Sequence, residues 1–68
     1  MENNSVVVKN TRRIMAEKGL KQKFVAEKVG ITSKQFSNLL NGRRVINAND
    51  VWKLSLALNV TPNELFGI

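Results

Sequence analysis

The sequence contains no cysteine and no histidine. A chain without cysteine cannot form disulfides, and this composition is typical of a reducing, intracellular setting. Without either residue type the chain lacks the usual ligands of zinc and related metals. We therefore expect no metal site and no cofactor, and a fold held together by its hydrophobic core alone.

Long apolar runs are also missing. No run approaches the ~18 residues that a membrane-spanning helix needs, so we expect no membrane span. The valines at 6–8 have no basic segment before them and no cleavage site after them, so we expect no signal peptide. The 68 residues suffice for one domain, residues 1–68. Because so small a domain hides only ~60% of its unfolded surface, each buried apolar residue matters.

Acidic residues are almost absent from the middle of the chain. Between Lys18 and Arg44 seven basic residues face a single acid, Glu27, and this surplus already equals the net charge of +6. The four basic and four acidic residues outside this stretch cancel. Such a concentration of positive charge indicates a polyanionic partner, with nucleic acid favoured over an anionic membrane.

Three capping boxes predict where helices begin. Thr32-x-x-Gln35 is the clearest, with Ile31 and Phe36 placed as a hydrophobic staple across it. Asn47-x-x-Asp50 has the same arrangement, and Thr61-Pro62-x-Glu64 adds proline at the first helical position. By contrast, Lys21 stands where a capping side chain would help the second helix.

Helix ends are marked by Gly19, Gly30, Gly42 and Gly67, and once by Asn59. Starts and ends together predict five helices near 6–18, 22–29, 33–41, 48–58 and 62–66. The first is the least regular, because three consecutive valines disfavour helix and could begin as extended chain. No stretch alternates with period two, so the expected fold is a compact all-α bundle.

The pair of helices at 22–41 has the spacing of a helix-turn-helix. Gly30 permits the sharp turn between them, and in this motif the second helix lies in the DNA major groove. Once its apolar residues are set aside, that helix presents Ser33, Lys34, Ser37, Asn38 and Asn41. These side chains can hydrogen-bond to bases and none repels phosphate, whereas an ordinary solvated face would more often include Glu.

From Ile14 to Phe66 the chain resembles the Cro/repressor-type helix-turn-helix family of phages and bacteria. The residues that carry the resemblance are Gly19-Leu20-x-Gln22, Val25-Ala26-Glu27-x-Val29-Gly30-Ile31, Asn41-Gly42-Arg43-Arg44 and Leu54-x-x-Ala57-Leu58-x-Val60-x-x-x-x-Leu65-Phe66. The resemblance implies a lambda repressor-like DNA-binding domain in a cytoplasmic, prokaryotic or phage-encoded regulator.

The resemblance also implies roles for individual residues. The positions that contact bases are Ser33, Lys34, Ser37 and Asn38. The positions that contact phosphates are Gln22, Lys23, Asn41, Arg43 and Arg44, and Gln22 would in addition brace the second helix of the motif. The partner is then double-stranded DNA, bound by a homodimer, and no small-molecule ligand is expected.

Two departures from the family pattern are informative. Met15 and Leu40 stand where the family often pairs a buried Arg with a Glu, so both partners have become apolar together. Trp52 and Leu56 lie one turn apart and form an outward apolar stripe. This stripe is either additional core or part of a dimer interface, and the expected dimer interface consists of Trp52, Leu56, Phe66 and Ile68.

Other classes of function fit less well. Without histidine or cysteine, and with its five acids scattered, the chain has no convincing acid–base pair, and we expect no enzyme. RNA is disfavoured because a helix does not enter the A-form major groove. The expected function is that of a sequence-specific DNA-binding transcriptional regulator, and repression is its expected effect. The main alternative is a protein-interaction module such as an antitoxin. The sequence leaves open whether the chain is a whole Cro-like protein or the head of a longer repressor.

Overall fold

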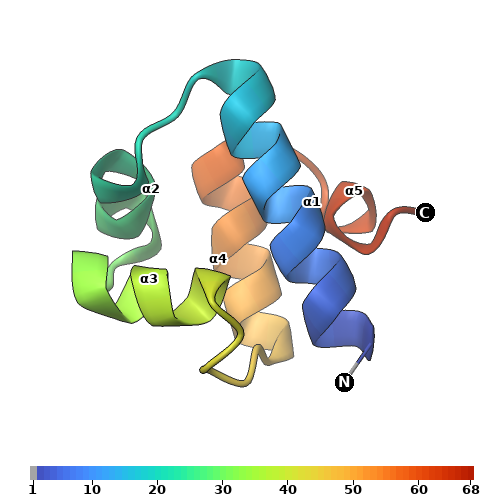
Figure 1. Cartoon of the computed structure of the whole chain (residues 1–68). Coiled ribbons are helices and arrows are strands. Elements are labelled where there is room, and N and C mark those ends of the chain that lie inside the picture. Colours follow the sequence, from blue (N-terminus) through green and yellow to red (C-terminus); the bar gives the residue numbers. More distant parts are fainter. Residues whose placement is uncertain (1) are drawn as a thin grey trace.

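The computed structural model describes residues 2–68, with side chains described from Val6 onward. It contains five helices: α1 (Glu2–Lys18), α2 (Gln22–Val29), α3 (Ser33–Leu40), α4 (Ala48–Leu58) and α5 (Pro62–Phe66) (Figure 1). No strand occurs in this part of the chain. The predicted all-α fold is therefore confirmed.

All three predicted capping boxes are formed. The Thr32 hydroxyl accepts from the main-chain N–H of Gln35 at 3.0 Å, and the Gln35 side chain accepts from the Thr32 N–H at 2.9 Å. Asn47 and Asp50 make the same reciprocal pair at the start of α4, as do Thr61 and Glu64 at the start of α5. Lys21 caps α2 without a side-chain hydrogen bond, as expected. Local hydrogen bonding thus determines the first residue of three of the five helices.

The predicted helix ends are also confirmed. The four glycines and Asn59 all have positive φ, between 60° and 92°. Asn59 is the one non-glycine residue among them, and its φ of 60° and ψ of 46° lie in the left-handed region that asparagine tolerates. Helix α3 ends at Leu40, one residue before the predicted end, because Asn41 serves as its C-cap.

The first helix differs from the prediction. It begins at Glu2 rather than near residue 6, and all three valines lie within it. Val7 is only 1% exposed and belongs to the hydrophobic core, whereas Val6 is exposed. Burying a valine side chain stabilises by about 1.5–2 kcal/mol, which exceeds the few tenths that valine loses in a helix relative to alanine.

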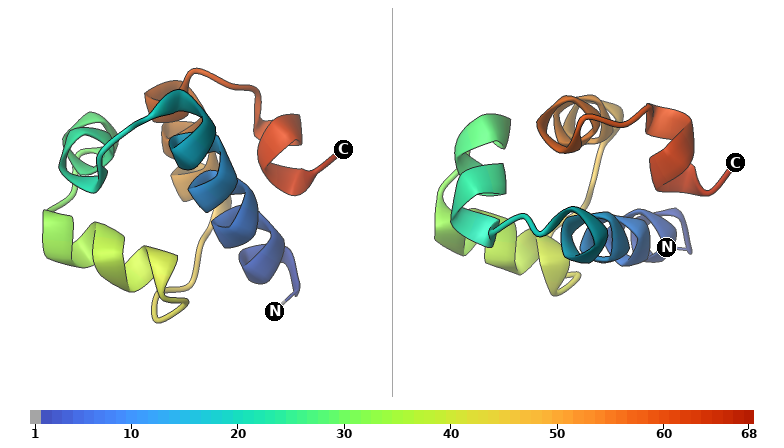
Figure 2. Two further views of the ribbon diagram at one scale, coloured as in Figure 1. Left: turned by 45° about the horizontal axis from the view of Figure 1, so that its top comes forward. Right: turned by 90° about the horizontal axis from the view of Figure 1, so that it is seen from above.

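The core fills the space where the helices meet. Helix α1 packs against α3, α4 and α5, while α2 packs against α3 and α4. Figure 2 shows α1 and α4 side by side, with α2 and α3 at one side of them and α5 at the other. The buried apolar side chains include Met15, Val25, Val29, Phe36, Leu39, Leu40, Val51, Leu54 and Leu58. This core leaves one side of α3 uncovered.

Candidate nucleic-acid interface

Helices α2 and α3 form the predicted helix-turn-helix. The chain leaves α2 at Gly30, whose φ of 92° is left-handed, and the N–H groups of Gly30 and Ile31 both donate to the Ala26 carbonyl. Three residues later α3 begins, and it crosses α2 steeply (Figure 2). Ala26, which is 1% exposed, provides the small side chain that lets two helices approach closely. The turn therefore holds α3 at the edge of the domain.

The two faces of α3 differ sharply. Phe36, Leu39 and Leu40 are buried in the core. On the other side Ser33 and Lys34 are exposed, and Ser37 and Asn38 are half-buried. None of these four polar side chains forms a hydrogen bond or ion pair with another residue whose side chain the structure describes. The predicted base-contacting residues thus share one face, and their donors and acceptors are available to a ligand.

The chain folds back on itself after α3. The Arg43 N–H donates to the Asn38 carbonyl at 2.9 Å, and the Gly42 N–H donates to the Leu39 carbonyl at 3.2 Å. This pair of bonds is the Schellman motif, in which a left-handed residue such as Gly42 is required. The motif keeps the exposed Arg43 beside the last turn of α3, where the predicted phosphate contact needs it.

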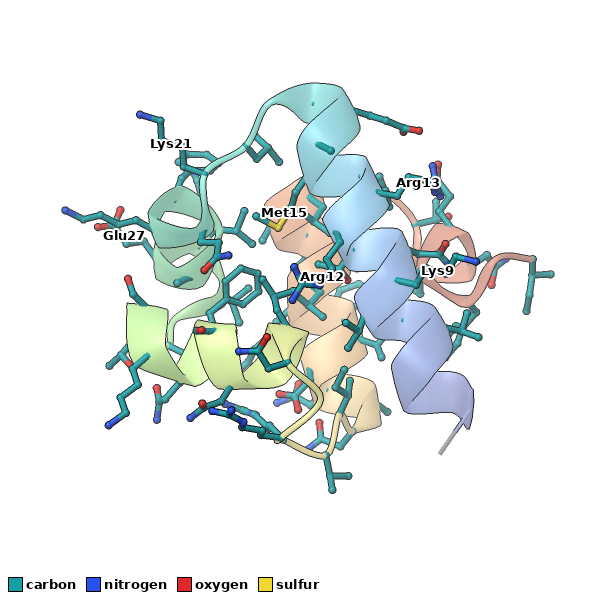
Figure 3. All side chains as sticks on the ribbon, viewed as in Figure 1. Lys9, Arg12, Arg13, Met15, Lys21 and Glu27 are labelled. Carbon is teal, nitrogen blue, oxygen red and sulfur yellow. The ribbon has the colours of Figure 1, made fainter. Side chains whose placement is uncertain are left out.

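Arg12 joins this site from a distant part of the chain. Its guanidinium donates to the Leu40 carbonyl at 2.9 Å and to Asn41 Oδ1 at 3.3 Å. Figure 3 shows the Arg12 side chain directed from α1 toward the C-terminal end of α3. Arg12 was not predicted to belong to the site, because its partners lie 28 and 29 residues further along the chain.

The other residues predicted to contact phosphates differ in their exposure and in their partners. Gln22 and Lys23 are exposed in the first turn of α2. No hydrogen bond connects the Gln22 side chain with α3 among the described residues, so its bracing role stays a prediction. Arg44 is half-buried and pairs with Asp50 at 3.2 Å. Asp50 is itself buried and caps α4, so Arg44 contributes to the fold whether or not it also contacts phosphate.

The predicted dimer residues are all exposed: Trp52 (56%), Leu56 (63%), Phe66 (36%) and Ile68 (89%). The alternative that Trp52 and Leu56 are additional core is therefore wrong. Two of them border different hollows. Leu56 borders a hollow together with Phe24 of α2, whereas Ile68 borders another with Arg13 and Glu17 of α1.

Two kinds of site are not found in the described part of the chain. No group of three or more acidic side chains is placed to hold a metal ion within residues 6–68, whose side chains the structure describes. In the same residues no helix has both the length and the apolar character required to cross a membrane.

Comparison with known proteins agrees with this geometry. The family model for the Cro/C1-type helix-turn-helix DNA-binding domain matches residues 10–68. Among solved structures, the chain is similar to the restriction-modification controller protein C.AhdI from Aeromonas hydrophila. The TM-score is 0.83 at 25% sequence identity, over 96% of this chain and 98% of that one. No curated protein matches the sequence. The chain therefore belongs to the Cro/C1-type helix-turn-helix family and is a DNA-binding transcription regulator rather than an enzyme.

Proposed function

We propose that the protein is a sequence-specific repressor that inserts α3 into the DNA major groove. The observation that carries this proposal is the outward face of α3. Ser33, Lys34, Ser37 and Asn38 lie there without protein partners or acidic neighbours on the helix. A major groove about 12 Å wide admits one helix and presents donors and acceptors that such side chains match. Exposed Lys23 and Arg43 flank the helix and supply charge for the phosphates.

We further propose that two copies bind a two-fold symmetric site. Half-sites on one side of DNA are about 34 Å apart, but the Cα extents of this domain are 26 × 24 × 19 Å. One copy therefore cannot occupy both half-sites. Helix α5 lies on the side of the domain opposite α2 and α3 (Figure 1). If the two copies met through Trp52, Phe66 and Ile68, the α3 helix of each copy would lie away from the dimer contact and would be free to enter one half-site.

Selection of bound sequences from random duplexes tests this function. We expect a palindromic consensus whose half-sites are separated by about one helical turn. Affinity for the selected duplex should fall steeply with salt, since phosphate contacts release counterions. Absence of any enriched sequence would contradict base recognition. Binding to a partner protein that is insensitive to salt would instead support an interaction module.

The likeness to C.AhdI favours a second candidate for the biological role, namely control of a restriction-modification system. This candidate rests on the match over nearly the whole of both chains. It is compatible with the same use of α3 and differs in the genes that are regulated. Mapping the selected consensus onto the genome of origin distinguishes the two. Sites beside restriction and methyltransferase genes would support control of such a system, and sites elsewhere would contradict it.

A further inference from the structure

A hollow of about 390 Å³ opens between α2 and α4, and we call it the α2–α4 hollow. Its lining residues are Lys18, Leu20, Phe24, Lys28 and the segment 56–59. Pockets that hold ligands are commonly about 300–1,000 Å³, so the hollow has room for one or two large side chains. No acidic residue lines it.

The apolar part of the hollow is open to solvent. Phe24 is 44% exposed and Leu56 is 63% exposed, although Leu20 and Ala57 beside them are half-buried. Both exposed side chains come from helices whose other faces are fully packed in the core. Phe24 and Leu56 are therefore available to a partner without any rearrangement of the fold.

Two lysines frame this apolar surface. Lys28 Nζ lies 5.5 Å from the centre of the Phe24 ring, which is the distance of a cation–π contact. Lys18 Nζ donates to the carbonyls of Leu58 and Asn59 at 2.9 and 3.3 Å. Lys18 is thereby held at the rim, and neither lysine pairs with a carboxylate among the described side chains.

The hollow is separate from the face of α3 that we propose to contact bases. It is lined by the C-terminal ends of α1 and α4 together with α2. In Figure 1 these two ends lie toward the top of the domain, and α3 lies lower, beneath α2. Lys18 and Lys28 belong to the basic stretch at 18–44, yet the fold directs them to this other surface. These two lysines therefore carry positive charge that does not take part in the proposed contact of α3 with DNA.

A second copy of the chain is a poor occupant for the α2–α4 hollow. The rim of the hollow contributes two cations, Lys18 and Lys28, and its lining has no acidic residue to pair with them. Bringing two such surfaces together would place like charges side by side, which opposes association. The complementary occupant has apolar anchors and negative charge.

We propose that the α2–α4 hollow binds an acidic amphipathic helix of a partner protein while α3 occupies DNA. Helices dock in grooves through apolar side chains spaced at i and i+4, and two such side chains would cover Phe24 and Leu56. Carboxylates on either side of them would face Lys18 and Lys28. Because the surface is separate from α3, this proposal can fail while the proposed base recognition holds.

The chain contains a single tryptophan, Trp52, one helical turn from Leu56, and it provides a natural fluorescent probe. The ligand to use is a synthetic helical peptide with leucines at i and i+4 and glutamates on its other positions. One control peptide replaces the glutamates by lysine, and another has the same composition in scrambled order. We expect only the first peptide to shift Trp52 emission in a saturable way. Equal binding of all three, or none, would overturn the proposal.

Matched variants locate the peptide on the surface. Phe24→Ser and Lys28→Gln should each weaken peptide binding at least fivefold. Lys9→Gln removes the same charge from the α1 surface that faces α5 (Figure 3) and should leave binding unchanged. If Phe24→Ser fails to fold by circular dichroism, Lys28→Gln against Lys9→Gln still decides. Equal effects of these two lysine variants would contradict the proposed surface.

Two further measurements distinguish a partner helix in the α2–α4 hollow from peptide binding to the α3 face and from a second copy of the chain. The peptide should bind equally well to the free protein and to its complex with the selected DNA duplex. Competition between peptide and DNA would show that the peptide occupies the α3 face, which overturns the proposal. If Phe24→Ser instead shifts the protein from dimer to monomer in sedimentation, a second copy covers the hollow and the proposal is wrong.

Discussion

The guanidinium of Arg12 donates to the main-chain carbonyl of Leu40 at 2.9 Å, and so connects α1 with the last turn of α3. The last carbonyls of a helix lack partners within the helix and carry partial negative charge. A cation placed there satisfies one of them and favours the helix terminus. Through Asn41 Oδ1 the same guanidinium also orients the residue that we expect to contact phosphate.

Replacing Arg12 by Ala should lower both stability and affinity for DNA. A hydrogen bond from a charged group contributes about 1.5–3 kcal/mol when buried, and we expect about 1 kcal/mol for the exposed Arg12. Binding to operator and random duplex should weaken together, since α3 loses its anchor to α1. Urea unfolding and DNA titrations measure the two effects.

Arg13→Ala is the control for this variant. This substitution removes the same charge, but Arg13 pairs with Glu17 on the exposed surface of α1, at 3.1 Å, and contacts no carbonyl of α3 among the described residues. Such pairs contribute at most about 0.5 kcal/mol. If Arg12→Ala and Arg13→Ala behave alike in both assays, the contact with Leu40 has no specific role.

The Met15 and Leu40 positions should show coupled energetics. Both side chains are buried, at 7% and 4% exposure. Leu40→Glu should destabilise by about 3–5 kcal/mol, because it buries a charge without a partner. Met15→Arg together with Leu40→Glu should recover part of this loss in urea unfolding. A double variant no more stable than Leu40→Glu would show that the two positions are not paired.

Thr11 is a site where the protein can be made more stable. Its side chain is fully buried in α1, and its hydroxyl has no hydrogen-bond partner among the described residues. Valine has the same branched shape without the unsatisfied group, whose burial costs about 1–3 kcal/mol. Thr11→Val should therefore stabilise by about 1 kcal/mol, or roughly 4–8 °C in Tm for a domain of this size. Thr11→Ser, which keeps the hydroxyl, should not raise the Tm. A lower Tm for Thr11→Val than for the parent protein would contradict the view that the Thr11 hydroxyl is buried without a partner.

Self-association should depend on the side of the domain that includes α5. Phe66→Ser removes an exposed apolar side chain there, and we expect it to abolish dimers on a palindromic duplex while single half-site binding persists. Val45→Ser, at another exposed apolar position, is the control. Sedimentation showing only monomers of the parent protein, both free and on the palindrome, would refute the dimer.

Local patterns predicted most of the fold. The capping boxes at Thr32, Asn47 and Thr61 join residues three apart, so the sequence itself shows both partners. The start of α1 was predicted near residue 6 and lies at Glu2. The three valines left the first helix uncertain in the sequence, because the burial of Val7 depends on helices formed much later in the chain. Tertiary packing there overrides the weak helix propensity of valine.

The candidate site shows the same division. The face of α3 follows from helical periodicity, and Ser33, Lys34, Ser37 and Asn38 lie where it predicted. The Arg12 contact and the pairing of Arg44 with Asp50 were not predicted, since they depend on how the loop after α3 returns to α1 and α4. The α2–α4 hollow joins Phe24 with Leu56, 32 residues away, and no local pattern connects them.

Recognition of bases by α3 is tested most directly by comparing Lys34→Ala, Asn38→Ala and Arg43→Ala on the selected operator and on a scrambled duplex. Lys34 suits the O6 and N7 of guanine, and Asn38 suits the edge of adenine. Each of these two variants should lose about 1–3 kcal/mol on the operator, relax preference at one base pair, and change little on scrambled DNA. Arg43→Ala should weaken both duplexes alike and lower the salt slope by about one. Equal losses on both duplexes for all three variants would contradict the account.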